Sequence, residues 1–174
     1  PDQKTVQLFF NVADTTLDYH PDWPPVTALD GTVLIDDAQV SVWSENAMLY
    51  DSSIRQLSAE TWLNESDQML LAIDGVLAGD AADGLQVINQ SPLTELVGAT
   101  FMDWRLAGEL DTHLQLTLNI GDTESDPQIA VDTLWREVDV FIEPGGLSLE
   151  AVSGQLTYRS SQGFSSHNMA GKLW

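Results

Sequence analysis

The chain contains no cysteine and few basic residues. The absence of cysteine excludes disulfide bonds, zinc–thiolate sites and thiol catalysis. Six Lys and Arg residues stand against 27 Asp and Glu residues, for a net charge of −21. Such a charge repels nucleic acid at long range, so we expect no nucleic-acid partner. No apolar run approaches the roughly 20 residues that a membrane-spanning helix needs.

Recognisable catalytic motifs are also missing. The sequence has no HExxH, no GxSxG and no glycine-rich phosphate loop, and its three histidines are scattered. The pair Asp36-Asp37 fits a turn better than a glycosidase pair, which needs two carboxyl groups facing one bond. The segment GDTESD (121–126) offers oxygen ligands for calcium but lacks the EF-hand spacing and its distal Glu. We therefore expect no enzymatic activity, no cofactor and no metal site.

The most informative segment that is present is LDTHLQLTLNI (110–120). Its leucines and Ile120 fall on one face of an extended strand, and Asp111, His113 and Gln115 fall on the other. Eleven residues at about 3.3 Å each give roughly 36 Å, about twice the usual strand length. A strand of this length is awkward for a compact sandwich and favours a wide, bent sheet with one apolar face.

Shorter alternating segments dominate the remainder of the chain and predict further strands. Clusters of Gly, Asp, Asn and Pro separate them: ADT, HPDWPP, DAADG, GDTESDP and EPGG. The predicted strands are VQLFFNV (6–12), GTVLI (31–35), AQVSVW (38–43), IRQLSAETWL (54–63), MLLAIDGVL (69–77), IAVDTLW (129–135), VDVFI (138–142), VSGQLTY (152–158) and the final HNMAGKLW (167–174).

One segment, SPLTELVGATFMDW (91–104), has helical rather than alternating spacing. Ser91 is a favourable N-cap, Pro92 suits the first helical position, and Glu95 suits the positive end of the helix. Gly98 costs about 1 kcal/mol relative to Ala, so the predicted helix is short and depends on packing. A weak internal echo relates 26–43 to 149–166, with Gly31 and Gly154 at matching places.

The order of several motifs resembles the periplasmic repeat region of the YhdP family of AsmA-like proteins. LDYHPDWPPVTALDG (17–31) is similar to the family's strand, Pro-Trp-Pro loop and Gly-containing strand. Further matches are SPLTELVG (91–98), WRLAGELDTHLQLTLNI (104–120), VSGQLTYRSSQGF (152–164) and MAGKLW (169–174). Family members are several times longer and carry an N-terminal membrane anchor. The resemblance therefore implies a fragment of a repeat region, without that anchor.

The resemblance implies a mainly β fold: a long curved antiparallel sheet that forms a U-shaped apolar groove, with one crossover helix near 91–104. It implies one fragment of a repeating array over 1–174, with about 1–90 as a first unit and 105–174 as the start of the next. Its implied function is to bind acyl chains and conduct phospholipid between the inner and outer membrane. Its implied place is the periplasm, within an inner-membrane-anchored protein of a Gram-negative bacterium. The expected partners are phospholipid or another acyl-chain lipid, and neighbouring repeats of the same chain.

Thirteen apolar residues of the predicted strands are candidates to line the groove. An acyl chain needs only a continuous apolar surface, at about 0.8 kcal/mol per buried CH₂ group. The main alternative is a β-sandwich module that binds glycans or acts in adhesion, in which the same residues form a closed core between two sheets. The candidates are Leu8, Phe10, Val40, Val42, Leu71, Ile73, Leu114, Leu116, Leu118, Ile120, Val131, Val140 and Leu156.

Overall fold

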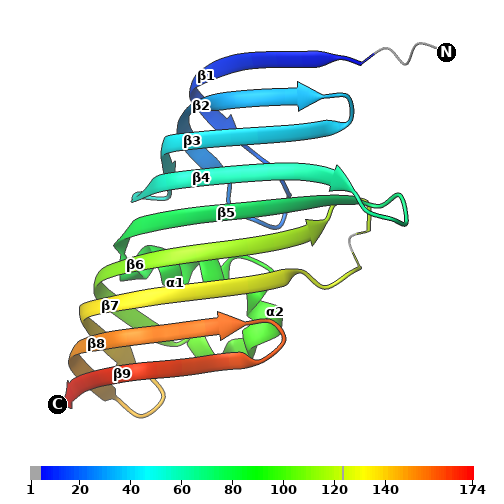
Figure 1. Cartoon of the computed structure of the whole chain (residues 1–174). Helices are drawn as coiled ribbons and strands as arrows, with labels where there is room; N and C mark the ends of the chain where they lie inside the picture. Colours follow the sequence, from blue (N-terminus) through cyan, green and yellow to red (C-terminus); the bar gives the residue numbers. More distant parts are fainter. Residues whose placement is uncertain (1–4, 123) are drawn as a thin grey trace.

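A single antiparallel sheet forms the whole framework of the protein (Figure 1). The computed structural model describes residues 5–122 and 124–174, and within them nine strands pair in sequence order from β1 to β9. This confirms the mainly β fold class with a long antiparallel sheet. The strands are β1 (Gln7–Leu17), β2 (Val26–Asp36), β3 (Gln39–Leu49), β4 (Ser52–Leu63), β5 (Met69–Asp80), β6 (Trp104–Asn119), β7 (Gln128–Ile142), β8 (Leu147–Arg159) and β9 (Gly163–Leu173).

The strands are longer than the sequence patterns predict. The alternation that predicts a strand from residue 110 continues back to Trp104, so β6 has 16 residues. The two predicted strands 129–135 and 138–142 are one strand, β7. An irregularity lies between Trp135 and Val138, where Glu137 has a φ of 52°. This β-bulge shifts the alternation by one residue, and the sequence pattern therefore looks like two strands.

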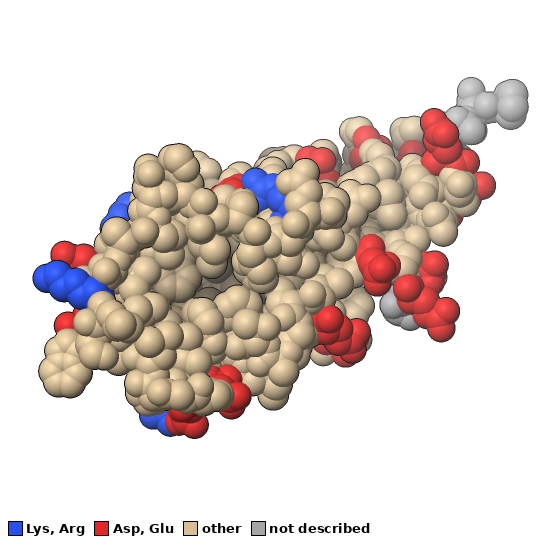
Figure 2. Space-filling view, turned by 90° about the horizontal axis from the view of Figure 1, so that it is seen from below, with Lys and Arg blue, Asp and Glu red and all other residues tan. Residues whose placement is uncertain are grey.

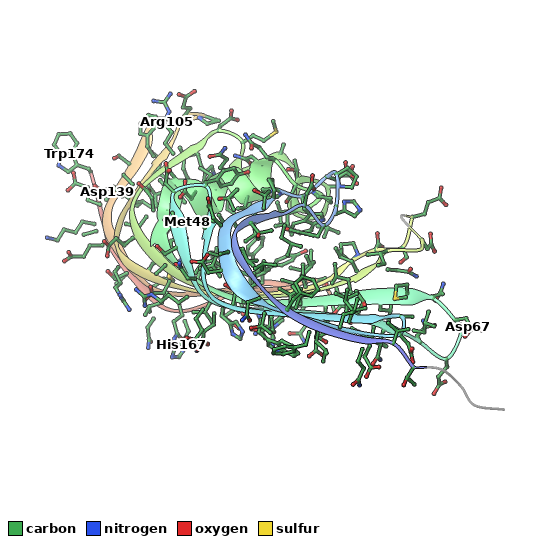
Figure 3. The ribbon with its side chains drawn as sticks, turned by 90° about the horizontal axis from the view of Figure 1, so that it is seen from above. Met48, Asp67, Arg105, Asp139, His167 and Trp174 are labelled. Atoms are coloured by element: carbon green, nitrogen blue, oxygen red, sulfur yellow. The ribbon has the colours of Figure 1, made fainter. Side chains whose placement is uncertain are left out.

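Bulges bend the sheet into a U (Figure 3). An extra residue in one strand increases the local twist and bends that strand. The bulges occur in strands at both ends of the sheet, and several adjoin one another across neighbouring strands. The residues with a positive φ in the interior of strands are Asp14 in β1, Ala28 in β2, Gly108 in β6, Glu137 in β7, Ala151 and Gly154 in β8 and Asn168 in β9.

The bulges are held by side chains from neighbouring strands. A bulged N–H group falls out of the regular ladder and needs another acceptor. Asp30 Oδ1 accepts the N–H of Asp14 at 2.8 Å, and Asp30 Oδ2 accepts Asn46 Nδ2 at 3.0 Å. These hydrogen bonds, first that from the Asp14 backbone and then that from Asn46, lower the pKa of Asp30 below 3.8. In the same way, Ser153 Oγ accepts from Glu137 N–H and Asp139 Oδ1 accepts from Ala151 N–H.

We expect the stability contributed by Asp30 to depend on pH. Its folded pKa is lower than its unfolded pKa, so the ionised carboxylate favours the folded state above pH 3.8. That contribution is lost as the pH falls through the lowered folded pKa. Asp30→Asn should therefore unfold at lower urea than the parent near neutral pH and match it in strong acid. An equal urea midpoint for both proteins near neutral pH contradicts the assigned hydrogen bonds.

Two short helices lie within the predicted range 91–104, and a longer helix precedes them. The longest is α1 (Ala81–Asn89), within a segment that the sequence pattern treats in part as a turn. The predicted helix at 91–104 is instead a short α2 (Leu93–Val97) and a 3-10 helix, η1 (Gly98–Phe101), and Trp104 already begins β6. The predicted crossover is also absent, because β5 and β6 are adjacent antiparallel partners in the described sheet. Residues 81–103 are called the helical segment below.

Two polar or small residues explain why DAADG begins a helix. Asp80 Oδ1 accepts the N–H of Ala82 at 2.9 Å, which makes Asp80 the N-cap of α1. Gly84 faces β6, and a Cβ atom at this position would lie 3.3 Å from Leu110 Cδ1. Gly84 therefore allows close packing of the helix on the sheet and does not form a turn. Ser52 Oγ also donates to Asp83 Oδ2 at 2.6 Å and ties α1 to β4.

The chain's own segments cover much of the concave face of the sheet. The helical segment lies inside the U (Figures 1 and 3), and Trp23, from the loop between β1 and β2, is buried in the same core. All strands in the described residues belong to one sheet, so the two-sheet packing of a β-sandwich is not observed there. The helices in residues 5–122 and 124–174 are all too short to cross a membrane.

Candidate functional site

An apolar row crosses the concave face from the first strand to the seventh. Because paired residues in neighbouring strands point to the same side, the strand register places the members of this row side by side. The row is Phe10–Val33–Val42–Ala59–Ile73–Leu116–Ile129. A parallel row contains Leu8, Ile35, Val40, Leu71 and Leu118. The concave face is thus apolar across most of the width of the sheet.

The thirteen predicted groove residues share this face but differ in how far they are covered. Three are exposed, namely Leu8 (52%), Phe10 (44%) and Ile120 (39%), and Val40 is half-buried. Three half-buried residues, Leu114, Val131 and Leu156, line a cavity under the helical segment. Six are buried in the core, namely Val42, Leu71, Ile73, Leu116, Leu118 and Val140. That these residues contact a ligand stays a prediction.

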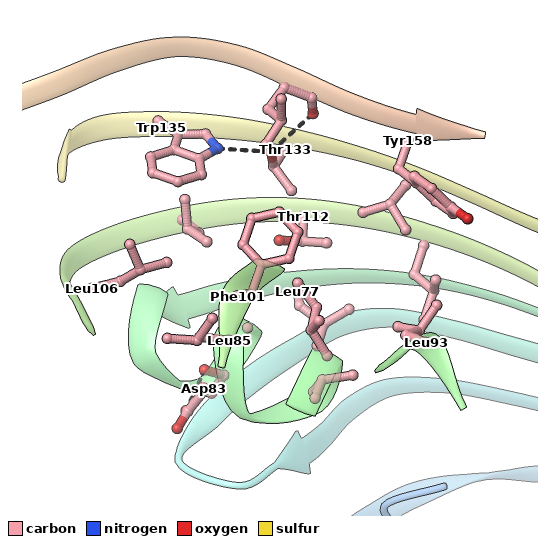
Figure 4. A pocket seen from close by; sticks show the side chains of 18 of the residues that line it. Leu77, Asp83, Leu85, Leu93, Phe101, Leu106, Thr112, Thr133, Trp135 and Tyr158 are labelled. Carbon is pink, nitrogen blue, oxygen red and sulfur yellow. Dashed lines mark hydrogen bonds between the residues drawn. The ribbon is translucent and has the colours of Figure 1, made fainter. Parts of the chain in front are cut away.

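The cavity lies between the helical segment and strands β5 to β9, with Leu49 and Ser52 added from the ends of β3 and β4 (Figure 4). Its volume is about 140 Å³. Leu85, Ile88 and Leu93 come from the helices, and Thr133 and Trp135 come from β7. Figure 2, which views the molecule from the β9 side, shows a hollow surrounded mainly by uncharged side chains. Lysines, arginines and carboxylates lie toward the periphery of that view.

Polar groups in the cavity wall are satisfied by one another. Trp135 Nε1 donates to Thr133 Oγ1 at 2.9 Å, and Thr133 Oγ1 donates to the carbonyl oxygen of Leu156 at 2.9 Å (Figure 4). In the described residues, no buried side-chain nitrogen or oxygen lacks a hydrogen-bond partner. The cavity therefore offers apolar contact without a directional polar anchor, which suits an aliphatic chain better than a sugar.

An aromatic contact joins the helical segment to β9 at one end of the cavity. The ring centroids of Phe101 in η1 and Phe164 in β9 are 5.4 Å apart in an edge-to-face arrangement. The ring centroids of Phe101 and Trp104 are 4.9 Å apart, and those of Phe164 and Tyr158 are 4.8 Å apart. These side chains hold the end of the helical segment against the sheet by packing alone.

The convex face is polar and partly charged. Asp74 binds His113 Nε2 at 2.9 Å and accepts Gln115 Nε2 at 2.9 Å. Arg159 Nη2 donates to both carboxylate oxygens of Asp132, at 2.8 and 2.9 Å. The two faces of the sheet thus differ as the alternation in LDTHLQLTLNI predicts.

A tyrosine beside the core has a strongly shifted pKa. Burial, and to a lesser extent the nearby Tyr50 and Asp18, raise the pKa of Tyr19 to about 12. Tyr19 packs against the buried cluster that contains Trp23 and Leu116. The shift reflects an apolar environment that disfavours the phenolate, and it assigns no acid–base role to Tyr19.

The structure places no metal-binding constellation in its described residues. Within residues 5–122 and 124–174, no three His, Asp or Glu side chains gather into a group that could hold an ion. Within GDTESD (121–126), the segment considered for calcium, Thr123 lies outside the described residues.

Sequence reasoning missed part of the cavity wall. Tyr158 and Trp135 follow the alternation of Leu156 and Val131 and could have been added from that pattern. Leu85 and Ile88 are spaced as on one face of a helix, but DAADG was interpreted as a turn. Phe101 and Phe164 come together only through tertiary packing, and no local pattern signals their contact.

Comparison with known proteins gives a match over nearly the whole chain. The family described as YhdP protein matches residues 2–174. The chain is also 23% identical over 145 residues to a protein of Escherichia coli (strain K12) named "Intermembrane phospholipid transporter YhdP". The alignment covers 82% of this chain and 11% of that relative, so the chain spans about a tenth of its length. No solved structure matches.

Proposed function

The chain belongs to the YhdP family, and on this premise we propose that it is a segment of a lipid-conducting groove in the bacterial cell envelope. The E. coli relative is named an intermembrane phospholipid transporter, and the ligand proposed for this chain is the acyl part of a phospholipid. The observation that carries the proposal is the apolar concave face, which extends across neighbouring strands of one open sheet. The groove axis runs across the strands, from the β1 edge toward the β9 edge.

The physical basis is the lack of directional contacts on this face. Moving an acyl chain along an apolar surface exchanges one set of weak contacts for an equivalent set, at about 0.8 kcal/mol per CH₂ group. A single tight site with polar anchors would hold the lipid instead of conducting it. The convex face, with its ion pairs and hydrogen bonds, stays in water and keeps the molecule soluble.

We further propose the surroundings of this segment. It lies in the periplasm as part of an inner-membrane-anchored protein, and neighbouring repeats continue the groove along the same chain. The strand order supports a division into about 1–90 and 105–174, because five strands precede the helical segment and four follow it. In the described part of the chain, β1 and β9 each pair on one side only, so both edges can accept a further strand.

Leu114→Asp is expected to block lipid loading in a chain that remains folded. Leu114 is half-buried and lines the cavity, so a carboxylate there holds water where an acyl chain must pass. Photo-crosslinking to radiolabelled phospholipid should fall at least about ten-fold, because each 1.4 kcal/mol of lost binding is a factor of ten. Circular dichroism checks that the variant is folded.

Thr117→Asp is the matched control for this experiment. Thr117 lies three residues further along the same strand, on the convex face, where its register partners Ala72 and Gln128 carry no charge. A charge at this position should leave lipid capture unchanged. An equal loss of crosslinked lipid in both variants, or no lipid capture by the parent chain, would contradict the proposed groove and favour the glycan-binding alternative.

A further inference from the structure

The cavity is too small for a complete phospholipid. An engineered apolar cavity of about 150 Å³ takes up one benzene molecule, or about six carbon atoms. The cavity under the helical segment, at about 140 Å³, is of similar size. Part of one acyl chain therefore fits beneath the helical segment as it stands. A lipid with two acyl chains passes this point only if the roof of the cavity moves.

The two ends of the helical segment are attached differently. The first helix, α1, is fixed by the Asp80 cap, by the Ser52–Asp83 hydrogen bond and by close packing on β6 at Gly84. In contrast, α2 and η1 pack mainly on α1 and on each other. Thr94 Oγ1 donates to the carbonyl oxygen of Ile88 at 2.6 Å, a bond within the segment itself. α2 and η1 meet the sheet through side chains: Leu93 and Val97 pack on the core cluster, and Phe101 contacts Phe164 at the far end.

We infer that residues 93–101 form a gate over the groove, which opens when Phe101 separates from Phe164 and admits a phospholipid acyl chain beneath it. This inference rests on the proposed function and adds a controlled step to it. Gly98 lies where α2 meets η1 and has a φ of +66°. A glycine can adopt more backbone conformations than other residues, so this position allows the two helices to change their relative orientation. α1 stays on the sheet and supplies the fixed side of the hinge.

The position of the gate fits its role. Buried Leu93 and partly buried Val97 pack on the core cluster that contains Leu116, so the gate covers the middle of the concave face. Phe101 and Phe164 close the cavity toward β9, where the proposed neighbouring repeat begins. Lipid moving between this segment and that repeat has to pass the aromatic pair.

The test locks the gate with engineered cysteines, which is simple in a chain without native ones. In Phe101→Cys/Phe164→Cys, a short bis-maleimide joins the gate to β9. Gln155→Cys/His167→Cys is the matched control, because a linker there also attaches to β9 but joins it to β8, on the opposite face from Leu156. A photo-crosslinking amino acid is placed at Thr133 in the cavity or at exposed Phe10 on the concave face of β1. Vesicles of radiolabelled phosphatidylethanolamine and phosphatidylglycerol supply the lipid.

We expect locking before loading to lower lipid capture at position 133 by about ten-fold and to leave capture at position 10 unchanged. Locking after loading should retain the captured lipid through a wash with unlabelled vesicles. The unreacted cysteine pair, which lacks the aromatic contact that closes the gate, should capture at least as much lipid at position 133 as the parent. The outer lock should capture lipid there like the parent. The gate is contradicted if lipid capture at position 133 is the same with and without the Phe101→Cys/Phe164→Cys lock. It is also contradicted if the outer lock lowers that capture by the same amount.

The two sites of capture also separate the gate from the groove. Lipid at position 10 and none at 133 in the unlocked protein makes the cavity an ordinary closed core, and the gate alone is then wrong. Lipid at neither position overturns the proposed function itself. Lipid at 133 only in the unlocked or loaded protein is the result that the gate requires.

Discussion

Leu116→Asp is expected to lower the free energy of unfolding by at least about 4 kcal/mol, because truncating a buried leucine alone costs about 2–5 kcal/mol and an unpaired buried carboxylate adds a desolvation cost. Leu116 is only 1% exposed and packs in the core that the sheet shares with the helices and Trp23. Since whole domains are stable by about 5–15 kcal/mol, this change removes a large share of the stability and should lower the urea midpoint substantially. Urea denaturation followed by tryptophan fluorescence measures the change.

Thr117→Asp is again the control, because it places the same carboxylate one residue away on the convex face. A surface substitution of this kind should change the free energy of unfolding by no more than about 0.5 kcal/mol. If Leu116→Asp is instead as stable as Thr117→Asp, water already reaches Leu116 in solution. The central part of the groove would then be open, and the packing described around Leu116 would be wrong.

Gly154→Val should detach β9 from β8. Gly154 has a φ of +141°, which residues with a side chain rarely adopt. A Cβ atom at this position would lie 2.6 Å from the carbonyl oxygen of Asn168 and 2.7 Å from Met169 Cα, both in the backbone of β9. Backbone strain and the steric clash together should cost about 3 kcal/mol or more.

Hydrogen exchange resolves this effect by strand. Amides of β9 that pair with β8 should exchange at least about a hundred-fold faster in Gly154→Val, because 1.4 kcal/mol is a factor of ten. Amides of the β3–β4 pair should be unaffected. Gly121→Ala is the control, because its nearest neighbour, Asn119 Oδ1, would be at an ordinary 3.6 Å and its φ is not in the left-handed region. Unchanged protection in β9 would mean that the two strands can separate at Gly154 at little cost.

The sheet could be predicted from the sequence because the patterns that identify strands and turns involve residues close together in the chain. Alternation along a strand identifies the apolar face, as in Leu114, Leu116 and Leu118, and the turn at Asp36-Asp37 fixes a hairpin. The same reasoning fails at bulges, where one inserted residue reverses the alternation. Because of the bulge at Glu137, the sequence pattern predicts two strands where the structure has one. Val138 and Val140 nevertheless lie on the same side of the sheet as Trp135.

The helices and the cavity depend on contacts between distant residues. Gly84 has the same signature in a turn and in a helix that packs tightly on a strand, and only the proximity of Leu110 distinguishes them. Likewise, an apolar strand face does not reveal whether it is open or covered. Leu8 and Leu116 have similar local patterns, yet one is 52% exposed and the other 1%. The difference arises because Trp23 and the helical segment cover Leu116 and leave Leu8 uncovered.

The sequential strand order has a consequence for how the protein reaches its native state. Each strand pairs with the strand just before it, so no pairing in the described sheet joins strands that are distant in the strand order. The sheet can therefore grow hairpin by hairpin as the chain emerges, without waiting for its C-terminal end. Only the pairing of β5 with β6 requires a long connection, the helical segment, to bring its two strands together. The element proposed to control lipid passage in the finished protein is thus also the longest loop closed during its assembly.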